Sequence, residues 1–355
     1  MKNIKQLLCM LMLLLGVLPM SAADEKGSSV NASEIVLEHI EDSYEWHVTD
    51  IGDRHIVINL PVIVKSSTGW HVFSTAKFAY DPDEKGYRQG PFNLAIATKG
   101  DHAGKIVELQ GGAEVLPSID ISITKTVMVL FINVFLLLLF ILIPARWYKN
   151  RKADAPAPGG FTGFVEMLVV WVEENVVEAG LSKEDAPKYS PYLMTCFFFI
   201  FVCNYMGIIP FPPGSGNVTG NIAVTFFLAL CTFIITQVSG SKAYWKDIFW
   251  PEVPLALKAF PLIPVIEFVG IFTKPFALMI RLFANMMAGH AIAVSMVCII
   301  FIVVGKALTV MLGMSFLAVV MAVFMMMLEL LVCFIQAMVF TTLSSIFIGL
   351  ARKKE

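Results

Sequence analysis

The residue with the greatest chemical consequence in this 355-residue chain is an arginine inside an apolar stretch. Arg281 lies in KPFALMIRLFANMMAGHAIAV, within an apolar segment that begins near residue 261. In a helix each residue adds ~1.5 Å, so this guanidinium would lie roughly 30 Å along the segment. A charged side chain at that depth costs at least ~3 kcal/mol in a membrane, so it requires an anionic partner or local water. Such a group is typical of ion pathways, although a structural ion pair within the chain is an alternative.

Titratable and polar residues follow on the same segment and on the next one. His290 lies nine residues after Arg281, and LELLVCFIQAMVF places Glu329 and Gln336 two helical turns apart on one face. If the two segments form an antiparallel hairpin, the register sets Gln336 level with Arg281 and Glu329 level with His290. Histidine titrates near neutrality and a desolvated glutamate is shifted toward it, so this pair could accept and release protons. A permanent buried ion pair is the alternative.

The helical projection divides the arginine segment into two faces. His290 projects to the side opposite Arg281, toward the rest of the chain. A surface of mostly small residues around one cation allows another helix to pass closely. The residues projecting near Arg281 are Lys274, Ala277, Ala284, Asn285, Ala288 and Ser295. Glu267 lies ~21 Å before Arg281 along the helix and would mark a second polar route.

The composition identifies the kind of element that must position these residues. Apolar residues make up 57% of the chain and charged residues only 15%, against about 25% in soluble proteins. The mean hydropathy is +0.74. A net charge of −2 gives no footprint for nucleic acid. These values predict a protein embedded in lipid.

Five apolar segments predict an all-α polytopic membrane protein with five crossings. The first three are near the ~20 residues that a crossing helix needs, and the last two are about twice as long. We interpret each long segment as one tilted or kinked helix, so that the chain ends in a long helical hairpin. The segments are 124–145, 191–211, 221–238, 261–304 and 309–351.

The charges on either side of these segments predict the orientation. Residues 1–23 combine two lysines, a short apolar run and the small residues Ser21, Ala22 and Ala23, which is typical of a secretory signal peptide; a membrane anchor is the alternative. Basic residues gather after the first crossing, at 239–260 and at the end of the chain. Because cytoplasmic loops favour lysine and arginine, the C-terminus is expected in the cytoplasm and residue 24 onward outside it.

Two further parts complete the predicted organisation. Residues 24–124 hold 16 acidic and 8 basic residues, and alternating stretches at 55–64 and 70–78 predict a small, exported, strand-containing segment ahead of the membrane domain, 125–355. The sequence gives this segment no function. Residues 161–180 mix apolar residues with four glutamates, which predicts an amphipathic helix on the cytoplasmic membrane surface, with an ordinary soluble helix as the alternative.

Several classes of protein are disfavoured. The five cysteines outside the signal peptide all lie in apolar segments without metal-site spacing, so we expect no metal, cofactor or disulfide. The chain has neither an HExxH nor a GxSxG motif, which argues against an intramembrane hydrolase. A self-contained secondary ion transporter is the alternative function, but RLFANMMAGH has no internal repeat of the kind that such transporters show.

At RLFANMMAGH the chain resembles subunit a of the membrane sector of the rotary F-type ATP synthase. The resemblance runs from about 125 to the C-terminus, through VEMLVVWVEENV, PYLMTCFFFIFVCNYMGIIPF, GNIAVTFFLAL, PVIEFVGIFTKPFALMIRLFANMMAGH and IQAMVFTTLSSIFIGLA. It implies a bacterial inner-membrane proton channel that is not catalytic by itself and works with the c-ring, subunit b and, through the complex, the F1 sector. It also implies that Arg281 faces the c-ring carboxylates, with Asn285 and Gln336 beside it.

The resemblance extends to the proton routes. Family members carry an acid and a histidine at His290 and Glu329, in either order. Glu267 matches the acidic residue of the cytoplasmic half-channel, and Asn204 matches the asparagine near the external side. Two positions depart from the family, because many members have Asn where this chain has Ala223 and some have an acid where it has Gly207. Residues 24–124 lie outside the resemblance.

Overall fold

In the computed structural model the chain forms two compact units. The first comprises residues up to Met128 together with Ser295–Ala318, and the second comprises Val129–Val294 and Val319–Glu355. The predicted signal peptide, 1–23, lies outside the described residues. The structure describes residues 41–51, 54–110, 113–149, 157–209, 214, 216–249, 262–303 and 308–352.

The first unit contains short antiparallel strands arranged in three sheets, whose orders are β1-β2, β4-β3-β9 and β5-β6-β7-β8. The alternating stretch at 55–64 lies in β2 and β3, and the stretch at 70–78 forms β4 up to Ser74 and then continues into a 3₁₀ turn. The strands are β1 (Glu45–Ile51), β2 (Arg54–Asn59), β3 (Pro61–Ser66), β4 (Gly69–Ser74), β5 (Tyr87–Gln89), β6 (Leu94–Ala97), β7 (Ile106–Gln110), β8 (Ala113–Val115) and β9 (Ile119–Asp120). Two 3₁₀ turns join them, η1 (Thr75–Lys77) and η2 (Pro91–Asn93).

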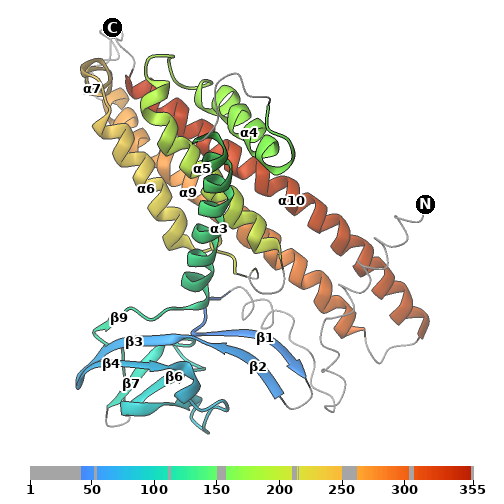
Figure 1. Cartoon of the computed structure of the whole chain (residues 1–355). Coiled ribbons are helices and arrows are strands. Elements are labelled where there is room, and N and C mark those ends of the chain that lie inside the picture. The colour runs from blue at the N-terminus through green and yellow to red at the C-terminus, as the bar shows by residue number, and fades with distance from the viewer. Residues whose placement is uncertain are drawn as a thin grey trace. The chain divides into compact units, whose positions relative to one another are not determined.

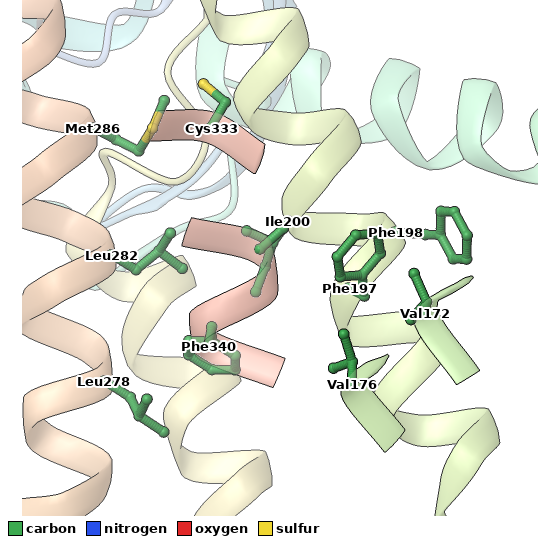
Figure 2. Packing of buried hydrophobic residues seen from close by; sticks show 11 residues of the cluster. Val172, Val176, Phe197, Phe198, Ile200, Leu278, Leu282, Met286, Cys333 and Phe340 are labelled. Carbon is green, nitrogen blue, oxygen red and sulfur yellow. The ribbon is translucent and has the colours of Figure 1, made fainter. Parts of the chain in front are cut away.

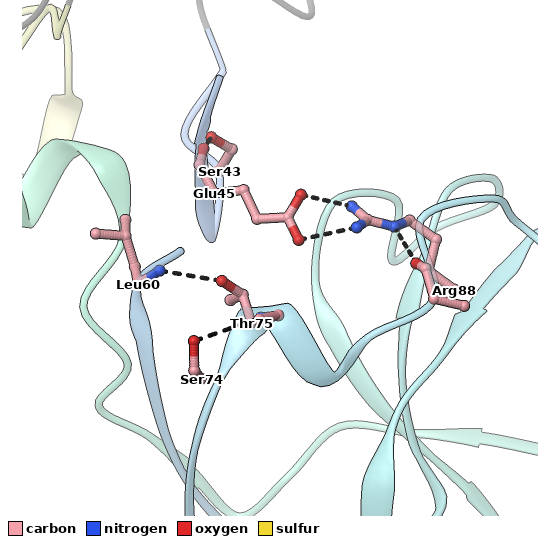
Figure 3. Close-up of polar contacts among 8 residues, drawn as sticks. Ser43, Glu45, Leu60, Ser74, Thr75 and Arg88 are labelled. Carbon is pink, nitrogen blue, oxygen red and sulfur yellow. Dashed lines mark hydrogen bonds and ion pairs between the residues drawn. The ribbon is translucent and has the colours of Figure 1, made fainter. Parts of the chain in front are cut away.

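A small apolar core and a largely buried ion pair hold the strands together. The core consists of Val62, Val64, Phe73, Phe78, Leu94, Ile96 and Ile106. Arg88 binds the Glu45 carboxylate through both terminal nitrogens, at 2.8 and 3.1 Å, and its Nε donates to the Ala79 carbonyl at 2.8 Å (Figure 3). Because the guanidinium matches the carboxylate in a bidentate geometry, it fixes β1 against β5.

The strands β1 to β9, Glu45–Asp120, are called the strand unit. Glu108 forms an acid-sensitive contact within this unit. The Ser67 hydroxyl and backbone N–H both donate to its carboxylate, and they hold the pKa of Glu108 below its usual 4.5. A depressed carboxyl pKa adds stability above the ordinary value, and this stability is lost as the pH falls through the lower, folded value. We therefore expect residues 45–120 to become protease-sensitive in the acid range below about pH 4.5.

Limited proteolysis of the full chain across this pH range measures the effect. Glu108→Gln should lower the resistance at neutral pH and flatten its dependence on pH, whereas Glu84→Gln, at an exposed turn, should leave the profile unchanged. An unaltered profile in Glu108→Gln would contradict the assignment.

The described residues from Lys125 onward are mainly helical (Figure 1). The helices are α3 (Lys125–Lys149), α4 (Gly160–Val172), the π-helical η3 (Glu173–Val177), α5 (Ala186–Ile208), α6 (Ile222–Val238), α7 (Lys242–Phe249), α9 (Leu262–Ile302) and α10 (Leu308–Arg352). Both final apolar segments form single long helices, as the sequence predicted. The helix predicted at 161–180 is α4 continued by η3, so its second half is π-helical.

Within the described residues, four helices are long and apolar enough to cross a membrane: α3, α5 and most of α9 and α10. A fifth crossing is counted only when α6 is taken together with α7, which bends away from it by 101°. The structure therefore has four or five candidate crossings where the sequence predicted five. α6 alone has only 17 residues. The Asn221 side chain accepts the Ala223 N–H and caps the start of the helix, and Ser239 ends it.

The helical unit has one main apolar core, to which α5, α9 and α10 all contribute (Figure 2). Leu278, Leu282 and Met286 form the buried stripe of α9. They pack with Phe197 and Ile200 of α5, and Cys333, Ala337 and Phe340 of α10 complete the cluster. This packing orients α9, because the face that includes Arg281 is left exposed.

A close backbone approach fixes the C-terminal end of α10. A methyl group on Gly349 would lie 1.9 Å from the carbonyl oxygen of Gly180, and Ser345 Oγ donates to the Val177 carbonyl at 2.9 Å. Gly349→Ala must therefore displace backbone, and we expect it to destabilise the unit by about 1–3 kcal/mol.

The midpoint of thermal unfolding of the purified complex measures the loss of stability expected for Gly349→Ala. Gly313→Ala on the same helix meets no atom within 4 Å, so it should leave the midpoint unchanged or raise it. Equal midpoints for the two variants would contradict the packing argument.

Candidate functional site

The centre of the site is the contact between His290 on α9 and Glu329 on α10. His290 Nδ1 lies 3.1 Å from Glu329 Oε1, and the two side chains are only 14% and 7% exposed. The antiparallel register expected from the sequence is the one that brings these residues together. An imidazole and a carboxylate at hydrogen-bond distance can share and exchange a proton.

Glycines make room for this pair. A methyl group on Gly289 would lie 3.1 Å from Glu329 Oε1, and one on Gly207 of α5 would lie 3.9 Å from His290 Cε1. Gly289 is therefore tight against the carboxylate, while Gly207 leaves ordinary contact space beside the imidazole. Gly207, a position that departs from the family pattern, thus lies next to the pair without contributing a titratable group.

Arg281 lies on the exposed face of α9, away from the apolar core. Its neighbours on this face are also exposed, namely Lys274, Ala277, Ala284, Asn285 and Ala288. In the part of the chain that the structure describes, Arg281 makes neither an ion pair nor a hydrogen bond. A guanidinium on a membrane-embedded helix needs a counter-charge or water. The described residues of this chain do not supply a carboxylate partner.

The other residues predicted from the sequence are not all brought to one place. Gln336 is buried, at 7% exposure, and forms no hydrogen bond with Arg281. Glu267 is exposed near the start of α9, ~21 Å from Arg281 along the helix. Asn285 is exposed one turn beyond Arg281. These residues mark positions along the hairpin rather than one cluster.

Asn204 of α5 is held in a hydrogen-bond network whose partners the sequence did not reveal, although a helix-packing hydrogen bond was the alternative to a route residue at this position. Its side chain is fully buried, accepts from Thr219 Oγ1 at 2.6 Å and donates to the Cys333 carbonyl at 3.4 Å. Nearby, Asn217 Nδ2 donates to the Met286 carbonyl at 3.2 Å. Thr219 and Asn217 were not predicted as site residues; the available signal was the run NVTG directly before a crossing helix.

The geometry defines a class of protein: a helical membrane protein with titratable side chains buried between two of its long helices. A buried histidine–glutamate pair lies between two long helices, and on the other side of α9 an exposed arginine has no ion-pair partner among the described residues. Among the described residues, no group of three His, Cys, Asp or Glu side chains could hold a metal ion.

Comparison with known proteins identifies the family. The family described as ATP synthase A chain matches residues 127–349, and this chain belongs to it. The chain is 36% identical to "ATP synthase subunit a" of Myxococcus xanthus over 71% of its own length and 78% of that protein. It is 41% identical to "ATP synthase subunit a" of Pelodictyon phaeoclathratiforme over 68% of each chain. Another relative is "ATP synthase subunit a 2" of Chlorobaculum tepidum, at 42% identity over 65% of this chain and 64% of that one.

Family membership establishes the general role. The chain is the proton-translocating stator component of the membrane sector and functions within a multi-subunit complex. Residues 35–124 match a separate family that is described only as a domain of unknown function.

Proposed function

We propose that Arg281 and the His290–Glu329 pair move protons to and from carboxylates carried by a ring of c subunits. The observation that carries the proposal is the exposed guanidinium on a face of mostly small residues, without a carboxylate partner among the described residues, and a buried titratable pair on the other side of the same helix. Small residues allow close passage of another helix, so the missing counter-charge can belong to a neighbouring subunit. The c subunits provide it.

The external half-channel runs past the histidine and the glutamate. A proton arriving from outside is accepted by this pair and passed to a ring carboxylate, which becomes neutral. A neutral acid enters lipid at far lower cost than a carboxylate, so the ring can turn. After nearly a full turn the carboxyl group releases its proton toward the cytoplasm near Glu267.

Arg281 separates the two half-channels. Its fixed positive charge repels a proton that would pass directly between them, and it attracts only an ionised carboxylate. Each charge that crosses a potential of 100 mV supplies about 2.3 kcal/mol, so several crossings together drive ATP synthesis elsewhere in the complex. Asn285 and Gln336 line the approach to the arginine. Asn204 supports the external side through its hydrogen bonds to Thr219 and Cys333.

The proposed topology has five crossings in the bacterial inner membrane. The strand unit lies in the periplasm after removal of the signal peptide, and the C-terminus lies in the cytoplasm. The segment formed by α4 and η3 lies on the cytoplasmic membrane surface. Subunit b holds the chain as part of the peripheral stalk, and the chain catalyses no reaction by itself.

A cross-linking experiment tests the proposal against a self-contained transporter. Ala288 and Phe276 are both exposed on α9, but Phe276 projects roughly 140° away from Arg281. With a photoreactive reagent on an introduced cysteine, Ala288→Cys should cross-link to a small hairpin subunit in the native membrane. Phe276→Cys should react with lipid instead. Absence of a cross-link from residue 288 to such a subunit, with the complex intact, would refute the proposed interface.

A further inference from the structure

One surface of the strand unit is exposed, apolar and unexplained by proton transport. It is the outer face of the sheet β4-β3-β9, made of Ile63, Lys65, Trp70, Val72, Ile119 and Ile121. Residues paired across an antiparallel ladder share one face. Lys65 pairs with both Trp70 and Ile119, and Ile63 pairs with Val72. The Ile121 N–H, two residues beyond Ile119, donates to the Ile63 carbonyl at 2.9 Å, so it continues the ladder.

The two faces of this sheet differ sharply in exposure. On the inner face Val62, Val64 and Phe73 belong to the core of the unit. On the outer face Trp70 is 55% exposed, Val72 71% and Ile121 59%. A contiguous apolar surface on a folded domain marks a binding surface. Its only charged member is Lys65, whose ammonium lies 6.0 Å from the centre of the Trp70 ring.

The chain leads directly from this sheet into a membrane-crossing helix, as Figure 1 shows for β9 and α3. Beyond β9, the Ile123 N–H donates to the Pro61 carbonyl at 3.1 Å, and the Lys125 N–H donates to the Ser43 carbonyl at 2.8 Å. The Thr126 N–H, in the first turn of α3, donates to Asp42 Oδ1 at 3.0 Å. The strand unit is therefore hydrogen-bonded to the chain up to the start of the helix, without a free linker.

These contacts limit the distance between the outer face and the bilayer. Ile121 and Lys125 are four residues apart, and a fully extended chain of that length spans at most ~14 Å. The headgroup layer on each side of a bilayer is roughly 5–7 Å thick. Ile121, at the edge of the outer face, is thus tethered to the first residue of α3 within about the thickness of two headgroup layers.

The composition of the face matches this layer. Tryptophan is enriched at the membrane–water boundary, where its ring is partly buried and its N–H stays wet. A lysine can lay its alkyl chain along apolar surface and place its ammonium among lipid phosphates. Valine and isoleucine side chains gain free energy when lipid removes them from water.

We propose that the outer face of β4-β3-β9 binds the phospholipid surface of the leaflet at which α3 begins. Trp70, Val72 and Ile121 insert among the headgroups and upper acyl chains, and Lys65 contacts lipid phosphate. The contact holds the strand unit against the membrane and braces the start of α3. It assigns an occupant to a surface of the domain at residues 35–124, whose family is described only as a domain of unknown function.

Spin labelling of the complete complex in phospholipid vesicles tests the proposal. A label on Val72→Cys should be more accessible to oxygen, which partitions into lipid, than to a water-soluble nickel chelate. The matched control is Asp101→Cys in the exposed loop between β6 and β7, where the chelate should be favoured. The unsubstituted complex corrects for label on the native cysteines.

The possible outcomes separate lipid from other occupants. Equal access of the chelate at residues 72 and 101 means a free aqueous face and overturns the proposal. Protection of residue 72 from both oxygen and chelate means a protein occupant, such as a second copy or another segment of this chain, and also overturns it. Preference for oxygen at residue 72 alone supports it.

A second measurement needs no cysteine. Phospholipid brominated near the headgroup end of its acyl chains should quench the Trp70 contribution to fluorescence, obtained as the difference between the unsubstituted complex and Trp70→Phe. Trp46, which is 3% exposed within the same unit, is the control, and its difference signal from Trp46→Phe should resist quenching. An unquenched Trp70 signal would overturn the proposal even if labelling perturbed the sheet.

Discussion

Arg281→Lys is expected to abolish ATP-driven proton pumping in inverted membrane vesicles, with a loss of more than about tenfold, although it preserves a positive charge. The guanidinium stays protonated in any protein environment, whereas a desolvated ammonium can lose its proton. A neutral lysine would neither attract the ionised ring carboxylate nor block direct proton flow. Its single nitrogen also lacks the planar fork that binds a carboxylate through two hydrogen bonds.

The chain offers a matched control for this substitution. Lys274 lies on the same exposed face of α9, two turns before Arg281. Lys274→Arg makes the reverse exchange and should leave pumping close to the unsubstituted rate, because no step of the proposed route uses that residue. The amount of chain in the membrane must be equal in all vesicles. Normal pumping by Arg281→Lys would remove the arginine from the mechanism.

The sequence predicted the hairpin and its register because the relevant signals are local and periodic. Apolar length defines a membrane helix, and polar residues two turns apart define a face. These signals sufficed to pair His290 with Glu329, which lie 3.1 Å apart. They also sufficed to place Arg281 on a different face of the helix from His290, and Arg281 is exposed in the structure.

The sequence could not predict features that depend on contacts between distant segments. The contact of Thr219 with Asn204 joins a loop to α5, and neither residue has a periodic signature. The bend between α6 and α7 depends on how the chain leaves the helix after Ser239. The π-helical turn at Glu173–Val177 keeps the apolar content of the segment while changing its hydrogen bonding, so periodicity alone does not reveal it.

The outer face of β4-β3-β9 is another feature that the sequence could not predict, because it depends on contacts between distant segments. Trp70 and Val72 alternate with core residues along β4, so the sequence indicates that one face is buried. It does not indicate that Ile119 and Ile121 join them, because β9 pairs with β3 from more than 50 residues away. The apolar surface exists only once this pairing is made.

Exchanging the members of the titratable pair should restore function that either single change removes. His290→Glu places two carboxylates within hydrogen-bond distance, and Glu329→His leaves two imidazoles without an acid. Like groups at such a distance disfavour the charged form that proton exchange needs. The double variant again contains one acid and one imidazole, and we expect it to pump faster than either single variant, with a coupling free energy of about 0.5–3 kcal/mol.

A second cycle distinguishes direct coupling from general damage to the helix. Glu267 lies ~34 Å from His290 along α9, so Glu267→His combined with His290→Glu should give losses that add. The space beside Gly289 is tight, because a methyl group there would lie 3.1 Å from Glu329 Oε1. Recovery in the exchanged pair should therefore be partial, since the imidazole at 329 must fit where a narrower carboxylate was accommodated. Additive losses in the His290–Glu329 cycle would mean that the two residues act independently, and the contact would then be structural rather than part of the proton route.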